Sequence, residues 1–346
     1  MNSVVFKAAE NAFFSESRHH YPEADISEAT IYHAIHQEIP VDYHCPDVRA
    51  RINGSLSAMA DRMTHSQDSV ALTEKPNPNK LKALLRAGLF WICFFACLFL
   101  VRVMVGTLGL GSSTGDARGQ WIGGVLLTIF VLIVTWIFVR TEKDPLIVPG
   151  TAIVVGSVPR TFAGMLCILP LAALSVISLH WLVPGVQFTM VTTSVPHVLS
   201  TLALYIVLAA YEEIAFRGYP MRRLLCAFSV WPTLLLIALI FAIYHVVLGW
   251  GLIQAIVGTG AGSILFGMAA IASKNGLAFP IGVHAGWNFV TWSLGTTGAG
   301  IWKMSFPEIL SGRVQRVGMC AYLVCMLIGI SLLWFWEERK KPSKSL

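Results

Sequence analysis

The sequence has little charge for its length. Only 13% of its 346 residues are charged, whereas 55% are hydrophobic. A soluble protein of this size needs a far more polar surface, so this composition excludes the soluble globular class. It places the chain among polytopic membrane proteins.

The sequence also lacks several features that are typical of other classes of protein, and each absence argues against one class. The seven cysteines are odd in number and lie mostly in apolar segments, so no disulfide framework is expected. The first 80 residues lack the apolar core of a cleavable signal peptide. No nucleic-acid motif accompanies the net charge of +6, which we assign to membrane topology and to contact with anionic lipid. No internal repeat supports an inverted-repeat transporter.

Long apolar runs are what the sequence does contain. Each is long enough to cross the roughly 30 Å of hydrocarbon as a helix. The sequence therefore predicts an all-α integral membrane bundle of about eight spans, with the seventh the weakest: 84–105, 121–139, 162–182, 198–216, 230–248, 252–273, 277–294 and 317–336.

The basic residues predict the orientation of this bundle. Cytoplasmic loops retain Lys and Arg, and placing the N-terminus inside puts fourteen basic residues on the cytoplasmic side against four or five outside. Both termini are therefore expected in the cytoplasm. Residues 1–80 would form a polar, partly disordered cytoplasmic extension, with one short amphipathic helix over 25–39, and residues 81–340 the membrane domain. A zinc site built from His33, His36, His44 and Cys45 fits no tetrahedral spacing well.

Acidic residues are rarer still inside the membrane region. Between residues 86 and 336 there are six, and only Glu212 and Glu213 fall within an expected span. An ionisable side chain in hydrocarbon costs several kcal/mol, on the order of 3 kcal/mol on insertion scales, so such a pair marks a functional-site candidate.

Helical spacing relates these carboxylates to other polar residues. Glu213 and Arg217 are four residues apart, which favours an ion pair and leaves Glu212 on another face. Phe241 and His245 share one helix face, as do His284 and Asn288. Because unpartnered polar groups are expensive to bury, these faces are expected to meet in one cavity. Helical spacing does not fix the depth of each side chain in the membrane.

Small residues indicate how closely these helices approach. Gly258, Gly262, Ser263 and Gly267 lie in the sixth expected span, and Gly282 and Gly286 flank His284 in the seventh. Such spacing lets helix backbones pack tightly. We assign these residues to packing.

The chemistry of this polar set leaves three alternatives open: hydrolysis with or without a metal, transport, and a structural role. Glu212 with His245 could deprotonate a water, while His284 and Asn288 could donate hydrogen bonds to an oxyanion. Glu212, His245 and His284 could also ligate a catalytic zinc, although the sequence contains no HExxH motif. The same residues would equally suit ion or proton transport, or structural hydrogen bonds between helices.

Three motifs resemble those of a known family. Glu212-Glu213-Ile-Ala-Phe-Arg217, Phe241-Ala-Ile-Tyr-His245 and His284-Ala-Gly-Trp-Asn288 are similar to the EExxxR, FxxxH and HxxxN motifs of the CPBP (ABI) intramembrane proteases. This family includes the type II CAAX prenyl endopeptidases. The resemblance covers about residues 160–295 and leaves the first two spans and the last outside.

The resemblance implies an intramembrane endopeptidase. Glu212 would be the base, helped by His245; His284 and Asn288 would stabilise the oxyanion; Glu213, Arg217 and Phe241 would support the site. It implies a glutamate mechanism without a metal cofactor, although a metalloprotease label with zinc persists for the family. The expected partners are the lipid bilayer and a membrane-associated peptide or protein, lipidated in CAAX-type members, with no nucleic acid. Bacterial-type members act in bacteriocin immunity or protein maturation, so a bacterial inner-membrane location and a non-catalytic scaffold or immunity protein are the corresponding expectations.

Overall fold

The structure is a computed structural model that describes residues 78–110, 117–141, 157–273, 276–298 and 300–339. All of them belong to one compact unit, His44–Leu346. The helix expected over 25–39 and the zinc set of His33, His36, His44 and Cys45 lie outside the described residues. The boundary near residue 80 stays a prediction.

The described part is a helical bundle. Its helices are α4 (Pro78–Thr107), α5 (Ala117–Thr141), α6 (Ser157–Leu182), α7 (Val195–Arg217), α8 (Tyr219–Leu225), α9 (Val230–Val247), α10 (Gly260–Ala272), α11 (Ala278–Ser293) and α12 (Ser311–Arg339). A π-helix, η1 (Gln254–Thr259), leads directly into α10, and a 3₁₀ turn, η2 (Glu308–Leu310), precedes α12. The all-α membrane class is confirmed.

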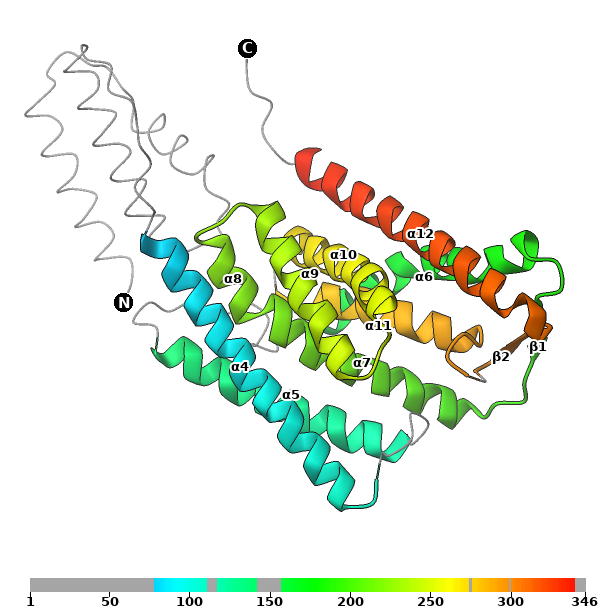
Figure 1. Ribbon diagram of the computed structural model, residues 1–346, viewed down its shortest axis with the longest axis horizontal. Coiled ribbons are helices and arrows are strands. Elements are labelled where there is room, and N and C mark those ends of the chain that lie inside the picture. The colour runs from blue at the N-terminus through cyan, green and yellow to red at the C-terminus, as the bar shows by residue number, and fades with distance from the viewer. Residues whose placement is uncertain (1–77, 111–116, 142–156, 274–275, 299, 340–346) are drawn as a thin grey trace, which may run out of the picture. The chain divides into compact units, whose positions relative to one another are not determined.

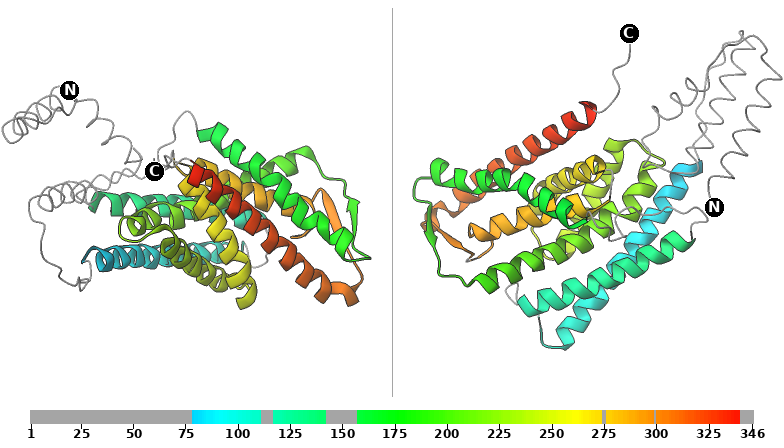
Figure 2. Two further views of the ribbon diagram at one scale, coloured as in Figure 1. Left: turned by 90° about the horizontal axis from the view of Figure 1, so that it is seen from above. Right: turned by 180° about the vertical axis from the view of Figure 1, so that it is seen from behind.

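Seven segments of the described chain, not eight, are long and apolar enough to cross a membrane. The exception is α11, the weakest of the predicted spans, which has 16 residues. At 1.5 Å per residue it is roughly 24 Å long, short of the hydrocarbon thickness. The helix still reverses the chain, because α12 begins at one end of the bundle and finishes at the end where α4 begins (Figure 1 and Figure 2).

Two short strands were not expected. β1 (Gln187–Met190) pairs antiparallel with β2 (Trp302–Ser305), with Gln187 opposite Ser305 and Met190 opposite Trp302. They join the α6–α7 connection to the α11–α12 connection. Strands of four residues carry too little alternation to be recognised in a sequence.

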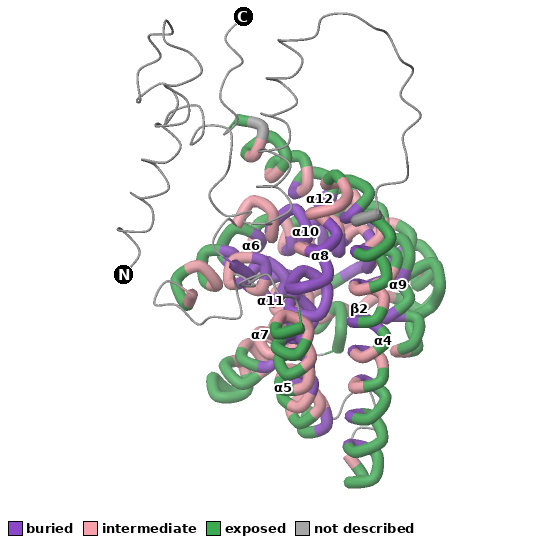
Figure 3. The backbone as a smooth tube through the Cα atoms, turned by 90° about the vertical axis from the view of Figure 1, so that its left-hand side faces the viewer, coloured by how far each residue is buried: buried purple, intermediate pink, exposed green. Residues whose placement is uncertain are grey.

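The helices form layers around a central group. Figure 1 shows α4 and α5 on one side and α6 and α12 on the other, with α7, α9, α10 and α11 between them. In Figure 3 the buried backbone gathers in α8, α10 and α11. The largest core cluster includes Phe90, Phe94, Phe216, Tyr219 and Tyr244, from four of these helices. The outer surface is apolar, as a bilayer requires: Phe99 is 71% exposed and Leu166 65%.

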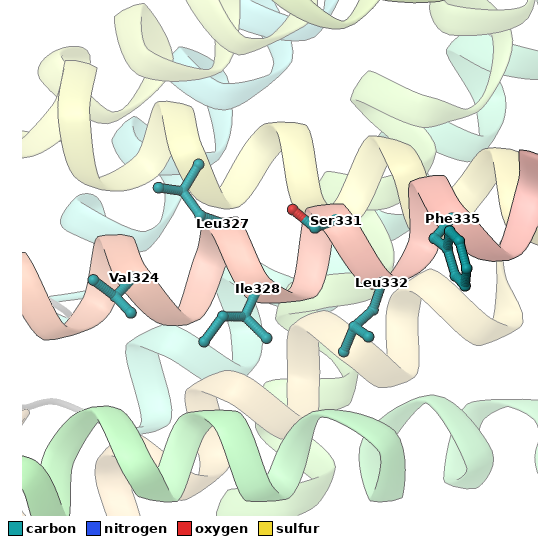
Figure 4. A pocket seen from close by; sticks show the side chains of 6 residues that line it. All are labelled: Val324, Leu327, Ile328, Ser331, Leu332 and Phe335. Carbon is teal, nitrogen blue, oxygen red and sulfur yellow. The ribbon is translucent and has the colours of Figure 1, made fainter.

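One shallow groove lies on this outer surface. It measures about 400 Å³ and is lined by Val324, Leu327, Ile328, Ser331, Leu332 and Phe335, all from α12 (Figure 4). None of these side chains is titratable. The groove therefore suits lipid tails and offers no acid–base chemistry.

Helix α11 is held against α6 by backbone contact. A methyl group at Gly282 would overlap the carbonyl oxygen of Thr161, and one at Gly286 would come within 2.9 Å of the Cα of Met165. A methyl at Gly267 in α10 would overlap Leu234. The packing role predicted for these three glycines is confirmed, and it fixes the helix that carries His284.

This close approach gives a stability prediction. Gly282→Ala should lower the folded yield and the melting temperature, by about 1–3 kcal/mol or more of unfolding free energy, because backbone atoms cannot move aside as a side chain can. Gly88→Ala in α4 is the control, since nothing lies within 4 Å of the methyl it would add. Size-exclusion yield and thermal melting in detergent measure both, and equal behaviour of the two variants would contradict the close packing.

Candidate active site

The last two turns of α7 carry the carboxylates. Ser194 caps the start of α7, where its hydroxyl accepts the backbone N–H of His197, and Gly218 ends the helix by donating to Glu213 O and Ile214 O. Every residue from Tyr211 to Arg217 is buried. The helix therefore has no outward face here, and its charged side chains must find partners inside the protein.

Glu213 and Arg217 form the expected ion pair. Arg217 Nη1 lies 3.2 Å from Glu213 Oε1, and both side chains are fully buried. Arg217 Nη2 also donates to the hydroxyl and the carbonyl oxygen of Ser263, at 2.7 and 3.0 Å. The guanidinium lies 4.7 Å from the ring centre of Phe241. Arg217, in α7, thus contacts α9 through Phe241 and α10 through Ser263. Phe241 supports the site through this contact.

His284 lies between the two glutamates. Its Nδ1 is 2.9 Å from Glu213 Oε1, and its Nε2 is 3.6 Å from Glu212 Oε2. Because the carboxylate can only accept, Nδ1 carries the hydrogen of this bond. The ring stacks on Phe266 with centroids 4.2 Å apart. A carboxylate that orients an imidazole in this way is a recurring arrangement in active sites.

His245 is oriented by its own helix. Its Nδ1 lies 2.9 Å from the carbonyl oxygen of Phe241, one turn earlier. Nδ1 must donate this hydrogen bond, which leaves Nε2 of the neutral ring as an acceptor. The rings of Tyr244 and Trp250 pack edge-on against it. The ring of Phe241 lies against both imidazoles, with its centroid 4.5 Å from that of His245 and 6.4 Å from that of His284, so His245 belongs to the same cluster.

The pairing differs in detail from the expected one. Sequence reasoning grouped Glu212 with His245 and His284 with Asn288, whereas the imidazole in contact with Glu212 is that of His284. The Asn288 side chain is half-buried and lies one turn beyond His284, and no hydrogen bond to its carboxamide is found among the described residues. The expected pairing differs because helical spacing predicts only which residues share a helix face. The position of His284 along the membrane normal depends on how α11 packs against α6.

Two tyrosines of the site were missed. The hydroxyls of Tyr211 and Tyr244 both lie 3.2 Å from Glu212 Oε1 and 2.8 Å from each other. Each directly precedes a motif residue, Glu212 or His245, in an otherwise apolar helix. A buried tyrosine needs a partner for its hydroxyl, and that requirement was the available signal. Ser263, expected to serve packing, also binds Arg217.

Zinc binding by Glu212, His245 and His284 stays a prediction. Within the described part of the chain, no group of three His, Cys, Asp or Glu side chains could hold a metal ion. Nδ1 of His245 is engaged by a backbone carbonyl and Nδ1 of His284 by Glu213, so Nε2 is the ring nitrogen of each that is open to a ligand.

The site lies within a segment that matches a known family. The model of the family described as Type II CAAX prenyl endopeptidase Rce1-like matches residues 194–290, which hold all three motifs. A comparison with curated proteins finds no match. The family supports a membrane endopeptidase of the CAAX type in general, and the apolar helices make the chain an integral membrane protein with the bilayer as partner. Residues 194–290 match the Rce1-like family model, so the resemblance to the CPBP family drawn from the three motifs is confirmed for this segment of the chain.

Proposed function

We propose that the protein is an intramembrane endopeptidase in which Glu212 activates a water molecule to hydrolyse a peptide bond. The observation that carries this proposal is that the two adjacent carboxylates have different partners. Glu213 is neutralised by Arg217 and bonded to His284, whereas no Arg or Lys pairs with Glu212 among the described residues. One glutamate thus supports the site and the other is free to take a proton.

The reaction follows from this arrangement. Glu212 Oε2 takes a proton from water, and the water oxygen forms a bond to the carbonyl carbon of the substrate. His245, whose Nε2 is an acceptor, helps to hold the water. The C–N bond then breaks, and Glu212 returns its proton to the leaving amine. The activation free energy is lowered because the base is buried and already oriented, so it need not reorganise during the reaction.

The other polar groups would stabilise the intermediate. The carboxamide of Asn288 has two N–H groups and is not engaged by any described side chain, so it can donate to the oxyanion. His284, whose Nδ1 donates to Glu213, points Nε2 to the space beside Glu212 and would donate from it to the oxyanion as an imidazolium, in which both ring nitrogens carry hydrogens. Arg217, anchored on Ser263, keeps Glu213 in place. The proposed mechanism uses these protein groups and no metal.

We also propose that the end of the bundle where α4 begins faces the cytoplasm. Among the described residues this end carries Lys80, Lys82, Arg86, Arg140, Arg160, Arg222, Arg223 and Arg339. The opposite end carries Arg102, Arg118, Lys303, Arg313 and Arg316. The bias has the sign of the positive-inside rule. Both termini would then be cytoplasmic, and a bacterial inner-membrane location stays a prediction.

The substrate class can be tested directly. We expect the purified protein in detergent to cleave at least one membrane-associated peptide from a panel of matched prenylated and unprenylated sequences, read by mass spectrometry. Preference for the prenylated member of a pair would identify a lipidated substrate, and equal cleavage would exclude recognition of the lipid. Cleavage of no peptide, with a protein shown to be folded by its melting curve, would favour a non-catalytic scaffold or immunity protein.

A further inference from the structure

The two oxygens of Glu212 have different surroundings. Oε1 is in contact with the hydroxyls of Tyr211 and Tyr244, each at 3.2 Å, while Oε2 faces His284 Nε2 at 3.6 Å. Tyr244 is fully buried and Tyr211 is 6% exposed. These hydroxyls come from α7 and α9, so their contact also joins two helices of the site.

The number of hydroxyl hydrogens limits how this trio can bond. The two tyrosines supply two hydrogens for three contacts, and the shortest contact is the 2.8 Å between the hydroxyls themselves. One tyrosine therefore donates to the other, and the hydroxyl that receives this bond still has a hydrogen of its own to place. A buried hydroxyl that donates to no acceptor is costly. The acceptor within reach of this second hydroxyl is Glu212 Oε1, so we assign its hydrogen to that oxygen.

We propose that Tyr211 and Tyr244 are positioning residues that hold Oε1 of Glu212 and leave Oε2 as the oxygen that exchanges protons with water. This inference rests on the proposed role of Glu212 as the base. The hydrogen bond at Oε1 survives the reaction: when Oε2 is protonated, Oε1 remains a carbonyl-type acceptor. The carboxyl group therefore keeps one orientation while the proton moves on and off Oε2.

Kinetics of three phenylalanine variants test the proposal. Tyr211→Phe and Tyr244→Phe should each lower kcat about 10- to 100-fold, the effect of one hydrogen bond to a charged group, with KM unchanged. The double variant should lose less than the product of the two single losses, because the two hydroxyls form one hydrogen-bonded chain that ends on one oxygen. The control is Tyr322→Phe, whose hydroxyl donates to Gly258 O at 2.7 Å, away from Glu212. It should lower the melting temperature and leave kcat unchanged.

Infrared spectroscopy separates this proposal from the proposed function. The carboxyl band of Glu212, assigned by its loss in Glu212→Gln, should shift in Tyr211→Phe and Tyr244→Phe and stay in place in Tyr322→Phe. An unshifted band would overturn the positioning role whether or not the protein cleaves peptides. A shifted band with an unchanged kcat in an active enzyme would also overturn it. If the band shifts while the wild type cleaves no peptide, the proposed function is wrong, but the positioning of Glu212 Oε1 by the two tyrosines is supported.

Discussion

Glu212→Gln should abolish peptide cleavage while leaving the protein folded. The carboxamide has the same shape and keeps an oxygen that can accept from Tyr211 or Tyr244, so the packing around it is preserved. It cannot take a proton from water, and the loss of a general base costs about 10²–10⁴-fold in rate. We expect the melting temperature to stay near that of the wild type or to rise, because a buried charge has been removed.

The control for this variant is Glu308→Gln. Glu308 is exposed at the start of η2, in the connection between β2 and α12, and belongs to none of the site's helices. The same chemical change there should leave both cleavage and stability unaltered. Initial rates on one identified peptide, with thermal melting beside them, measure the pair. Cleavage retained by Glu212→Gln would remove Glu212 from the role of base.

Arg217→Leu should have the largest effect on stability. The change removes the partner of Glu213, which has a fully buried side chain, and the two hydrogen bonds to Ser263. Breaking a buried ion pair by removing one member costs about 3–5 kcal/mol, because the remaining charge is left uncompensated. We expect a lower folded yield and melting temperature, and loss of activity as His284 loses its fixed partner. Glu213→Ala should act in the same direction.

A double variant distinguishes support of the fold from support of the chemistry. Glu213→Leu combined with Arg217→Met removes both charges, so much of the lost stability should return. Activity should not return, since His284 Nδ1 then has no carboxylate to donate to. Arg316→Ala, at an exposed position of α12, is the control and should melt like the wild type. An unchanged melting curve for Arg217→Leu would contradict the supporting role of the ion pair.

The sequence predicted the class of fold well because a membrane imposes simple demands. A helix must be about 20 apolar residues long to cross, and seven of the eight expected spans satisfy this in the described structure. The remaining one, the seventh expected span, is the 16-residue helix α11, whose glycines pack closely against α6. The β1–β2 pairing joins segments more than a hundred residues apart, which local patterns cannot reveal.

The site was predictable in its composition and less so in its contacts. The spacing of Glu213 and Arg217 foretold their ion pair, because both lie on one helix. The position of His284 against both glutamates depends on how α11 packs, a tertiary property without a local signal. The tyrosines were overlooked because aromatic residues are common in apolar helices, and only the proximity of two hydroxyls to one carboxylate distinguishes them.

The central claim is that a protein carboxylate, Glu212, activates the water. It is tested most directly by the cleavage rate of one peptide measured for the wild type and for Glu212→Gln, each with and without a strong chelator. The mechanism proposed here predicts that the chelator leaves the wild-type rate unchanged and that the variant is inactive in both conditions. Loss of wild-type cleavage on chelation, restored by added zinc, would contradict it.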